Sequence, residues 1–306
     1  MSITEIEEYL YQIDVETAGM KNFIASYILE GKRSTIVETG PASSIPNLLH
    51  CLRELNIGLD EVAYVAVSHV HLDHGGGAGT LLKYLPKAKA IVHSKGVSHM
   101  VNPEKLWQQS KEVLGRIAEM YGKPEPIPED RIIAGTDNMT LDIGDNINLK
   151  VVETLGHASH HLSYYLPLNE GIFPGDAAGI YLNAINVVVP TTPAPFRLDI
   201  ALASLNKLKT LKPRVLYYSH FGKARQAMER LQAYEAQLRL WAKTARQGVE
   251  KKEGLEEISR KITERDVAVQ KAKEYVKSHL LLNETVLNES VFGIVDFVDR
   301  FRDFPV

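Results

Sequence analysis

Three of the eleven histidines fall within six residues, in the segment His69-Val70-His71-Leu72-Asp73-His74. The segment before it, 62–68, is short, apolar and rich in β-branched residues, which is typical of a buried strand. The segment after it, 75–85, begins with glycines and continues with leucines at helical spacing. The histidines are therefore predicted to lie on a strand-to-helix loop, where α/β proteins commonly place chemistry.

The spacing within this loop suits metal binding. If the chain is still extended at His69 and His71, their side chains point the same way, and a following turn brings Asp73 and His74 to a neighbouring point. Imidazole nitrogen and carboxylate oxygen are good ligands for zinc and similar metals, and a catalytic site keeps one position for water. One loop could thus serve two metal ions, but it cannot supply three ligands to each.

Further candidate ligands come from other parts of the chain. His157, Asp176 and His220 each follow an apolar, strand-like segment, as His69 does. All four are therefore predicted to converge at one edge of a sheet structure.

This ordered set resembles the metallo-β-lactamase superfamily, in particular its glyoxalase II and lactonase-like branch, over roughly residues 10–222. The H-x-H-x-D-H motif is intact, and the later His, Asp and His follow in the family's order. The resemblance implies an α/β fold, a four-layer αβ/βα sandwich with a helical C-terminal extension and with metals at one edge of two facing sheets. It implies a first metal held by His69, His71 and His157, a second held by Asp73, His74 and His220, and a bridging Asp176.

The chemistry expected of such a site is hydrolysis. Two metals that share one water lower its pKa to near neutrality, and they stabilise the oxyanion that forms on a substrate carbonyl. A G-x-S-x-G motif for a serine nucleophile is absent from the sequence. We expect a binuclear metallo-hydrolase that uses a metal-bridging hydroxide on an ester, thioester or lactone, with Asp73 and Asp176 as catalytic residues. Zinc is the expected metal, with iron and manganese as alternatives.

Other functions on this fold stay open. Some members that carry the motif bind one iron and oxidise persulfides with dioxygen, which here would involve His71 or His69, together with His157 and Asp176. A phosphodiesterase or nuclease is disfavoured by the short spacing between Asp176 and His220 and by the net charge of −3. A catalytically silent binding protein is a third alternative, which the complete ligand set disfavours.

Several residues near the ligands have expected roles in the family pattern. Glu38 stands where the family usually has the aspartate of Asp-Thr-Gly, an acid that steadies the ligand loop. His161 stands where the family often has a second, supporting histidine, and His160 is expected to be a bystander or a pocket wall. Of the others, His99 and His279 are expected on the surface or in helices.

The walls of the substrate pocket are predicted from aromatic residues outside the motif. Apolar residues in 102–121 recur at three- and four-residue spacing and predict one helix. Trp107 and Tyr121 in this segment, and Tyr181 further along, are candidates for contact with a small-molecule substrate. Packing in the core is the alternative for Trp107.

The sequence divides into a predicted catalytic domain, 1–222, and a helical C-terminal extension, 223–306. The segment 223–246 has the pattern of a long amphipathic helix, and further helices are expected after it. Their apolar stripes must pack either on the core or on a second subunit, so a homodimer is one expectation.

Composition restricts the location of the protein. The only cysteine, Cys51, has no partner for an intramolecular disulfide, which favours a reducing compartment. No apolar run approaches eighteen residues, and the first ten residues lack the features of a signal peptide. We expect a cytoplasmic protein that binds neither membrane nor nucleic acid.

Overall fold

The computed structural model describes residues 2–276 and 284–305, so His279 lies outside the described residues. The chain forms two compact units. The first, called the sheet unit, comprises Met1–Glu153, His160–Gly175 and Val215–Arg225. The second, called the helical unit, comprises Thr154–Ser159, Asp176–Arg214 and Gln226–Val306. The domain boundary expected at residue 222 stays a prediction.

The first sheet of the sheet unit has seven strands whose spatial order follows the chain. They are β1 (Ser2–Glu7), β2 (Leu10–Asp14), β3 (Ala25–Leu29), β4 (Ser34–Val37), β5 (Val62–Ala66), β6 (Lys89–His93) and β7 (Ile132–Gly135). Strands β1 to β4 are antiparallel, whereas β4 to β7 are parallel. Parallel neighbours need crossover connections, and α1 (Ile45–Glu54) and α2 (Ala78–Leu82) lie in the first two of them. The strand and the helix predicted on either side of the histidine loop are confirmed as β5 and α2.

The second sheet has six strands in the order β15-β14-β11-β10-β9-β8. They are β8 (Thr140–Gly144), β9 (Ile147–Glu153), β10 (Leu162–Leu166), β11 (Gly171–Phe173), β14 (Val215–Tyr218) and β15 (Gly222–Arg225). Only β11 and β14 pair in parallel; the other neighbours are antiparallel. The strands predicted ahead of His157, Asp176 and His220 are confirmed as β9, β11 and β14.

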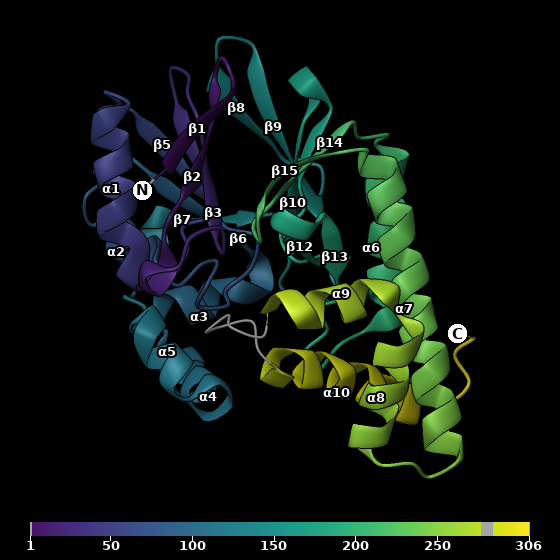
Figure 1. Cartoon of the computed structure of the whole chain (residues 1–306). Helices are drawn as coiled ribbons and strands as arrows, with labels where there is room; N and C mark the ends of the chain where they lie inside the picture. Colours follow the sequence, from purple (N-terminus) through teal and green to yellow (C-terminus); the bar gives the residue numbers. More distant parts are fainter. Residues whose placement is uncertain (1, 277–283, 306) are drawn as a thin grey trace. The chain divides into compact units, whose positions relative to one another are not determined.

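The two sheets of the sheet unit share one buried core, and Figure 1 shows them as two separate groups of arrows. Two buried tyrosines connect this core to the segments that carry candidate ligands. Tyr164 on β10 donates its hydroxyl hydrogen to the carbonyl of Val67, and Tyr27 on β3 donates to the carbonyl of Tyr218, at 2.7 and 2.6 Å. Because a buried hydroxyl needs a partner, these bonds fix where β5 and β14 end.

The predicted single helix over 102–121 is wrong. The structure has α3 (Val97–Val101) and then two helices, α4 (Glu104–Leu114) and α5 (Arg116–Tyr121). Gly115, between the last two, has φ 52° and ψ −123°, which no helix accommodates. Glycine adopts such a conformation without steric cost, so the chain breaks at this residue.

The helical unit contains a short hairpin and five helices within the described residues (Figure 1). The hairpin pairs β12 (Ile180–Leu182) with β13 (Val187–Val189). The helices are α6 (Leu198–Thr210), α7 (Ala227–Glu250), α8 (Leu255–Arg265), α9 (Val267–Val276) and α10 (Glu284–Arg300). The long amphipathic helix therefore begins later than predicted, because residues 222–225 pair with β14 as strand β15. Among the described residues, no helix is long and apolar enough to cross a membrane.

Buried polar contacts hold the helical unit together. The carboxylate of Asp266 accepts hydrogen bonds from the Trp241 indole and the Gln237 amide of α7, at 2.7 and 3.2 Å. The same carboxylate accepts from the backbone N–H groups of Ala268 and Val269 at the start of α9. One buried carboxylate thus fixes the packing of α7 against the α8–α9 corner.

Candidate metal centre

The histidine loop follows β5 and turns sharply after His71. The amides of His74 and Gly75 both donate to the carbonyl of His71, at 3.1 and 2.9 Å, so the turn lies at residues 71–75. Gly76 makes the turn sterically feasible, because a Cβ atom there would lie 2.2 Å from the Leu72 carbonyl oxygen. The turn expected after His71 is confirmed, and so is the approach of the His69 and His71 side chains to each other.

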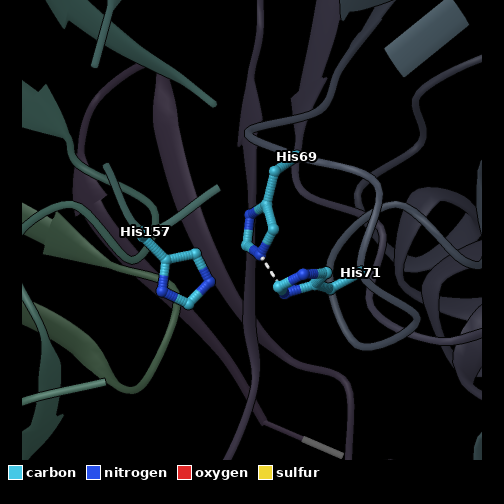
Figure 2. A group of neighbouring side chains, drawn as sticks. All are labelled: His69, His71 and His157. Atoms are coloured by element: carbon cyan, nitrogen blue, oxygen red, sulfur yellow. Dashed lines mark hydrogen bonds between the residues drawn. The ribbon is translucent and has the colours of Figure 1, made fainter. Parts of the chain in front are cut away.

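His69 and His71 form the first pair of candidate ligands. His69 Nε2 lies 2.9 Å from His71 Nδ1, and Figure 2 shows these two nitrogens facing each other. On its other side, His69 Nδ1 lies 2.9 Å from the Ser68 hydroxyl. The buried rings of His69 and His161 lie 5.0 Å apart, which agrees with a supporting position for His161. The third side chain drawn in Figure 2, His157, belongs to the helical unit.

Asp73, His74 and His220 form a second group of candidate ligands in the sheet unit. The two Nε2 atoms of the histidines are 3.2 Å apart. Asp73 Oδ2 lies 3.8 Å from Nε2 of His74 and 3.5 Å from Nε2 of His220. Ligands at about 2.0–2.1 Å from a tetrahedral zinc ion lie roughly 3.4 Å from one another. The three atoms therefore have the separation of ligands that share one metal.

The hydrogen-bond partners of these histidines show which nitrogen faces the group. His220 Nδ1 lies 3.1 Å from the carbonyl oxygen of Phe23, and His74 Nδ1 lies 3.4 Å from a carboxylate oxygen of Glu38. Carbonyl and carboxylate oxygens only accept, so both Nδ1 atoms donate their hydrogens. In a neutral ring, Nε2 then has no hydrogen and carries a lone pair. Two lone pairs and the Asp73 carboxylate thus converge, and such acceptors repel unless a cation or proton lies among them. This donor set fits a divalent metal ion.

Glu38, directly after β4, supports the ligand loop through a contact with His74. Its buried carboxylate accepts the bond from His74 and one from the Ser219 hydroxyl at 3.1 Å, both through Oε1. Its backbone is left-handed, with φ 64°, which a non-glycine residue adopts only at a cost in strain. The adjacent Thr39 binds the carbonyl of His74 through both its hydroxyl and its amide, at 2.8 and 3.1 Å. The contact expected of Glu38 with the ligand loop is confirmed.

The helical unit contributes its own pair of candidate ligands, His157 and Asp176. Nε2 of His157 lies 3.5 Å from Oδ2 of Asp176, and both side chains are buried. His157 Nδ1 lies 3.0 Å from the carbonyl oxygen of Thr191 and therefore donates to it. The segment that carries His157 packs on α6, because the Ser204 hydroxyl donates to the Leu155 carbonyl at 2.7 Å.

The predicted substrate residues have local partners of their own. Trp107 on α4 is half-buried, and the Lys111 ammonium lies 5.5 Å from its ring centroid. Tyr181 on β12 is buried; its hydroxyl donates to Asn186 Oδ1 at 3.0 Å, and the Arg230 guanidinium lies 4.7 Å from its ring centroid. Their contact with a substrate stays a prediction.

Sequence reasoning missed the groups that orient the ligands. Ser68, Ser219 and Phe23 in the sheet unit and Thr191 in the helical unit all belong to this set. Ser68 and Ser219 each directly precede a predicted ligand, which was a usable signal. Phe23 and Thr191 act through backbone carbonyls, which every residue has, so residue type carried no signal for them.

The chain is similar to known proteins over most of its length. Residues 21–220 match the metallo-β-lactamase superfamily. The chain is 31% identical over 218 residues to the metallo-β-lactamase fold-containing protein ST1585 of Sulfurisphaera tokodaii, covering 70% of this chain and 78% of that protein. It is also similar to the solved structure of ST1585 from Sulfolobus tokodaii, with a TM-score of 0.65, 28% identity, and coverage of 75% and 85% of the two chains.

A second solved structure covers more of the chain. The metallo-β-lactamase family protein TTHA1429 from Thermus thermophilus has a TM-score of 0.69 at 20% identity and covers 96% of this chain and 94% of that one. At this identity the likeness concerns the fold alone. The α/β sandwich fold with C-terminal helices, expected from the sequence, is confirmed.

Proposed function

The chain belongs to the metallo-β-lactamase superfamily, and from that premise we propose that it is a binuclear metal-dependent hydrolase of an ester, thioester or lactone. The observation that carries the proposal is the convergence of three acceptor atoms from Asp73, His74 and His220. Two histidines held as Nδ1–H tautomers, with a carboxylate beside them, are the donor set of a divalent metal site.

We assign the ligands to two metal ions, with zinc as the expected ion because the set is rich in imidazole. The first site would use His69 Nε2, His71 Nδ1 and His157 Nε2; the second would use Asp73 Oδ2, His74 Nε2 and His220 Nε2; Asp176 would be shared. Support for this assignment comes from the Ser68, Glu38, Phe23 and Thr191 contacts, each of which engages Nδ1 of its histidine and leaves Nε2 for the metal.

When bound, the metals would supply a water of lowered pKa and a Lewis acid for the substrate carbonyl. The residues of the chain would do the rest. Asp176 would orient the attacking water through its carboxylate and take up its proton. His71 and Asp73 are partly exposed, whereas His69, His74 and His220 are buried, so a substrate in the sheet unit would approach past His71 and Asp73.

The rival function is that of a mononuclear-iron persulfide dioxygenase. It would use His69 or His71 with His157 and Asp176 and would assign no role to Asp73, His74 and His220. Since the latter group has metal-ligand separations and positioned tautomers, two metals are favoured. A phosphodiesterase of this fold would share both sites and differs from our proposal only in substrate.

We extend the proposal to the setting of the enzyme. Cys51 is buried and unbonded, which agrees with a reducing, cytoplasmic location. The substrate is proposed to be a small molecule, and a homodimer formed through the C-terminal helices is a further proposal, testable by the mass of the protein in solution.

The test begins with the metal content of the purified protein and its hydrolysis of esters, thioesters, lactones and phosphodiesters, with glutathione persulfide under oxygen as the rival substrate. We expect two metal equivalents and hydrolysis that a chelator abolishes and zinc restores. A matched histidine control is His50→Ala, because His50 lies on the surface beside Glu54. Oxygen consumption with the persulfide and no hydrolysis of any ester, thioester or lactone would refute the proposal.

A further inference from the structure

The C-terminal helix α10 approaches one loop of its own unit at backbone distance. A Cβ atom on Gly293, within α10, would lie 1.8 Å from the Thr192 carbonyl oxygen and 2.9 Å from the Ala194 amide nitrogen. Glycine weakens a helix relative to alanine, so its presence inside α10 is explained by this close approach. The contact joins backbone to backbone and has no flexible side chain that could yield.

Two hydrogen bonds join the same loop to α10. The Thr192 hydroxyl donates to the Ser290 carbonyl at 2.6 Å, and the Thr192 amide donates to the Ser290 hydroxyl at 3.3 Å. Both residues are buried. Ser290 and Gly293 are three residues apart and therefore lie on one face of the helix, so this face holds the loop at two adjacent points.

The residue next to Thr192 holds a proposed metal ligand. The carbonyl oxygen of Thr191 accepts the Nδ1 hydrogen of His157 at 3.0 Å, which leaves Nε2 as the lone-pair nitrogen facing Asp176. A shift of the loop would move the Thr191 carbonyl and release the His157 ring. Such partners of metal-bound histidines set both the tautomer and the ring orientation.

We propose that α10 is a positioning element of the metal centre, which acts through Ser290, Gly293 and the 191–192 loop to fix the tautomer and orientation of His157. The inference rests on the proposed function for its consequence in metal binding, but the positioning itself does not require a metal. It gives the C-terminal extension, which lies beyond the family match at residues 21–220, a role in the chemistry.

The variant that tests the proposal is Gly293→Ala. Alanine favours the helix, so any harm comes from the clash with the 191–194 loop and not from a weaker helix. The matched control is Gly254→Ala at the start of α8, where an added Cβ meets nothing within 4 Å. Ser290→Ala removes the acceptor of the Thr192 amide, and Thr192→Val removes the donor to the Ser290 carbonyl; neither adds bulk. These two variants test the proposal if Gly293→Ala does not fold.

The first readout uses the metal-free protein. Proton–nitrogen correlation spectra of the imidazoles should show His157 as a protected Nδ1–H tautomer in the wild type and in Gly254→Ala, and a mixed or exchanging ring in Gly293→Ala. The second readout is zinc affinity by competition with a chelator. One of the two zinc ions should bind about tenfold more weakly in Gly293→Ala, with a smaller loss in the two hydrogen-bond variants.

Each outcome decides a question. A folded Gly293→Ala protein with an unchanged His157 tautomer and unchanged zinc affinities overturns the positioning role, as does the same result for both hydrogen-bond variants if Gly293→Ala is unfolded. Equal losses in Gly254→Ala also overturn it. A wild-type protein that binds no zinc would refute the proposed function, while the metal-free spectra would still test the positioning.

Discussion

Replacement of Glu38 tests how the ligand loop is held. Glu38→Ala removes the acceptor of the His74 Nδ1 hydrogen and of the Ser219 hydroxyl hydrogen. His74 would then lose the contact that fixes its tautomer, and its Nε2 lone pair would face the metal for only part of the time. We expect the second metal to bind more weakly, while the site of His69 and His71 is largely kept.

The size of the effect follows from the geometry. Loss of such a partner typically lowers metal affinity about 10–100-fold. The Glu38–His74 contact is long for a hydrogen bond, at 3.4 Å, so the lower end of this range applies. We expect a loss of about tenfold, which is about 1.4 kcal/mol, and activity at limiting zinc should fall in the same proportion and recover at saturating zinc.

Backbone strain provides an internal comparison, because Glu38 has φ 64°. Glycine at this position relieves roughly 1–2 kcal/mol of strain but loses roughly 0.5–1 kcal/mol more chain entropy on folding. Glu38→Gly should therefore be about 0.5–1 kcal/mol more stable than Glu38→Ala, yet equally poor in zinc binding. The matched control is Glu170→Ala, a glutamate with φ 54° on a hairpin of the second sheet.

The assay is titration of the metal-free protein with cobalt, whose absorption reports each site, together with denaturant unfolding. Two cobalt affinities that are both unchanged in Glu38→Ala would refute the reasoning. An equal loss in Glu170→Ala would show that the effect is not specific to the Glu38 carboxylate.

Three further changes have distinct expected results. His220→Ala should lower the bound zinc from two equivalents to one, as measured by elemental analysis, and retention of two would contradict the assigned ligand set. Tyr164→Phe deprives the Val67 carbonyl of its hydroxyl donor and should lower the free energy of unfolding by about 1–2 kcal/mol; an unchanged denaturation midpoint would contradict this. Burial raises the pKa of Asp14 above its ordinary value of 3.8, despite its bonds to the amides of Glu16 and Asn22. Because the folded state holds this proton more tightly than the unfolded state, the contribution of Asp14 to stability is greatest at low pH and falls as pH rises through the range above 3.8. The free energy of unfolding of metal-free Asp14→Asn, measured with denaturant, should not show this fall. Parallel curves of unfolding free energy against pH for variant and wild type would exclude the contribution of Asp14.

Local sequence was sufficient to predict the elements that carry the candidate ligands. The apolar segment before His69 and the glycines after His74 predicted β5, the turn and α2, because strand and helix periodicities and glycine's freedom act over a few residues. The same reasoning failed where pairing partners decided the outcome. Residues 223–225 belong to the segment predicted as a helix, yet they form part of β15 because they pair with the edge of β14.

The sequence by itself determined the chemical types of the ligands, their order and the family. Only the tertiary structure decided which nitrogen of His74, His157 and His220 faces the other candidate ligands and what holds it there. The partner of His220 is 197 residues away, at Phe23, and that of Thr192 is 98 residues away, at Ser290. These contacts use backbone carbonyls, which every residue carries, so residue type cannot reveal which of them accepts. The ligands could be recognised as side chains, whereas their orientation depends on a fold that brings distant backbone to them.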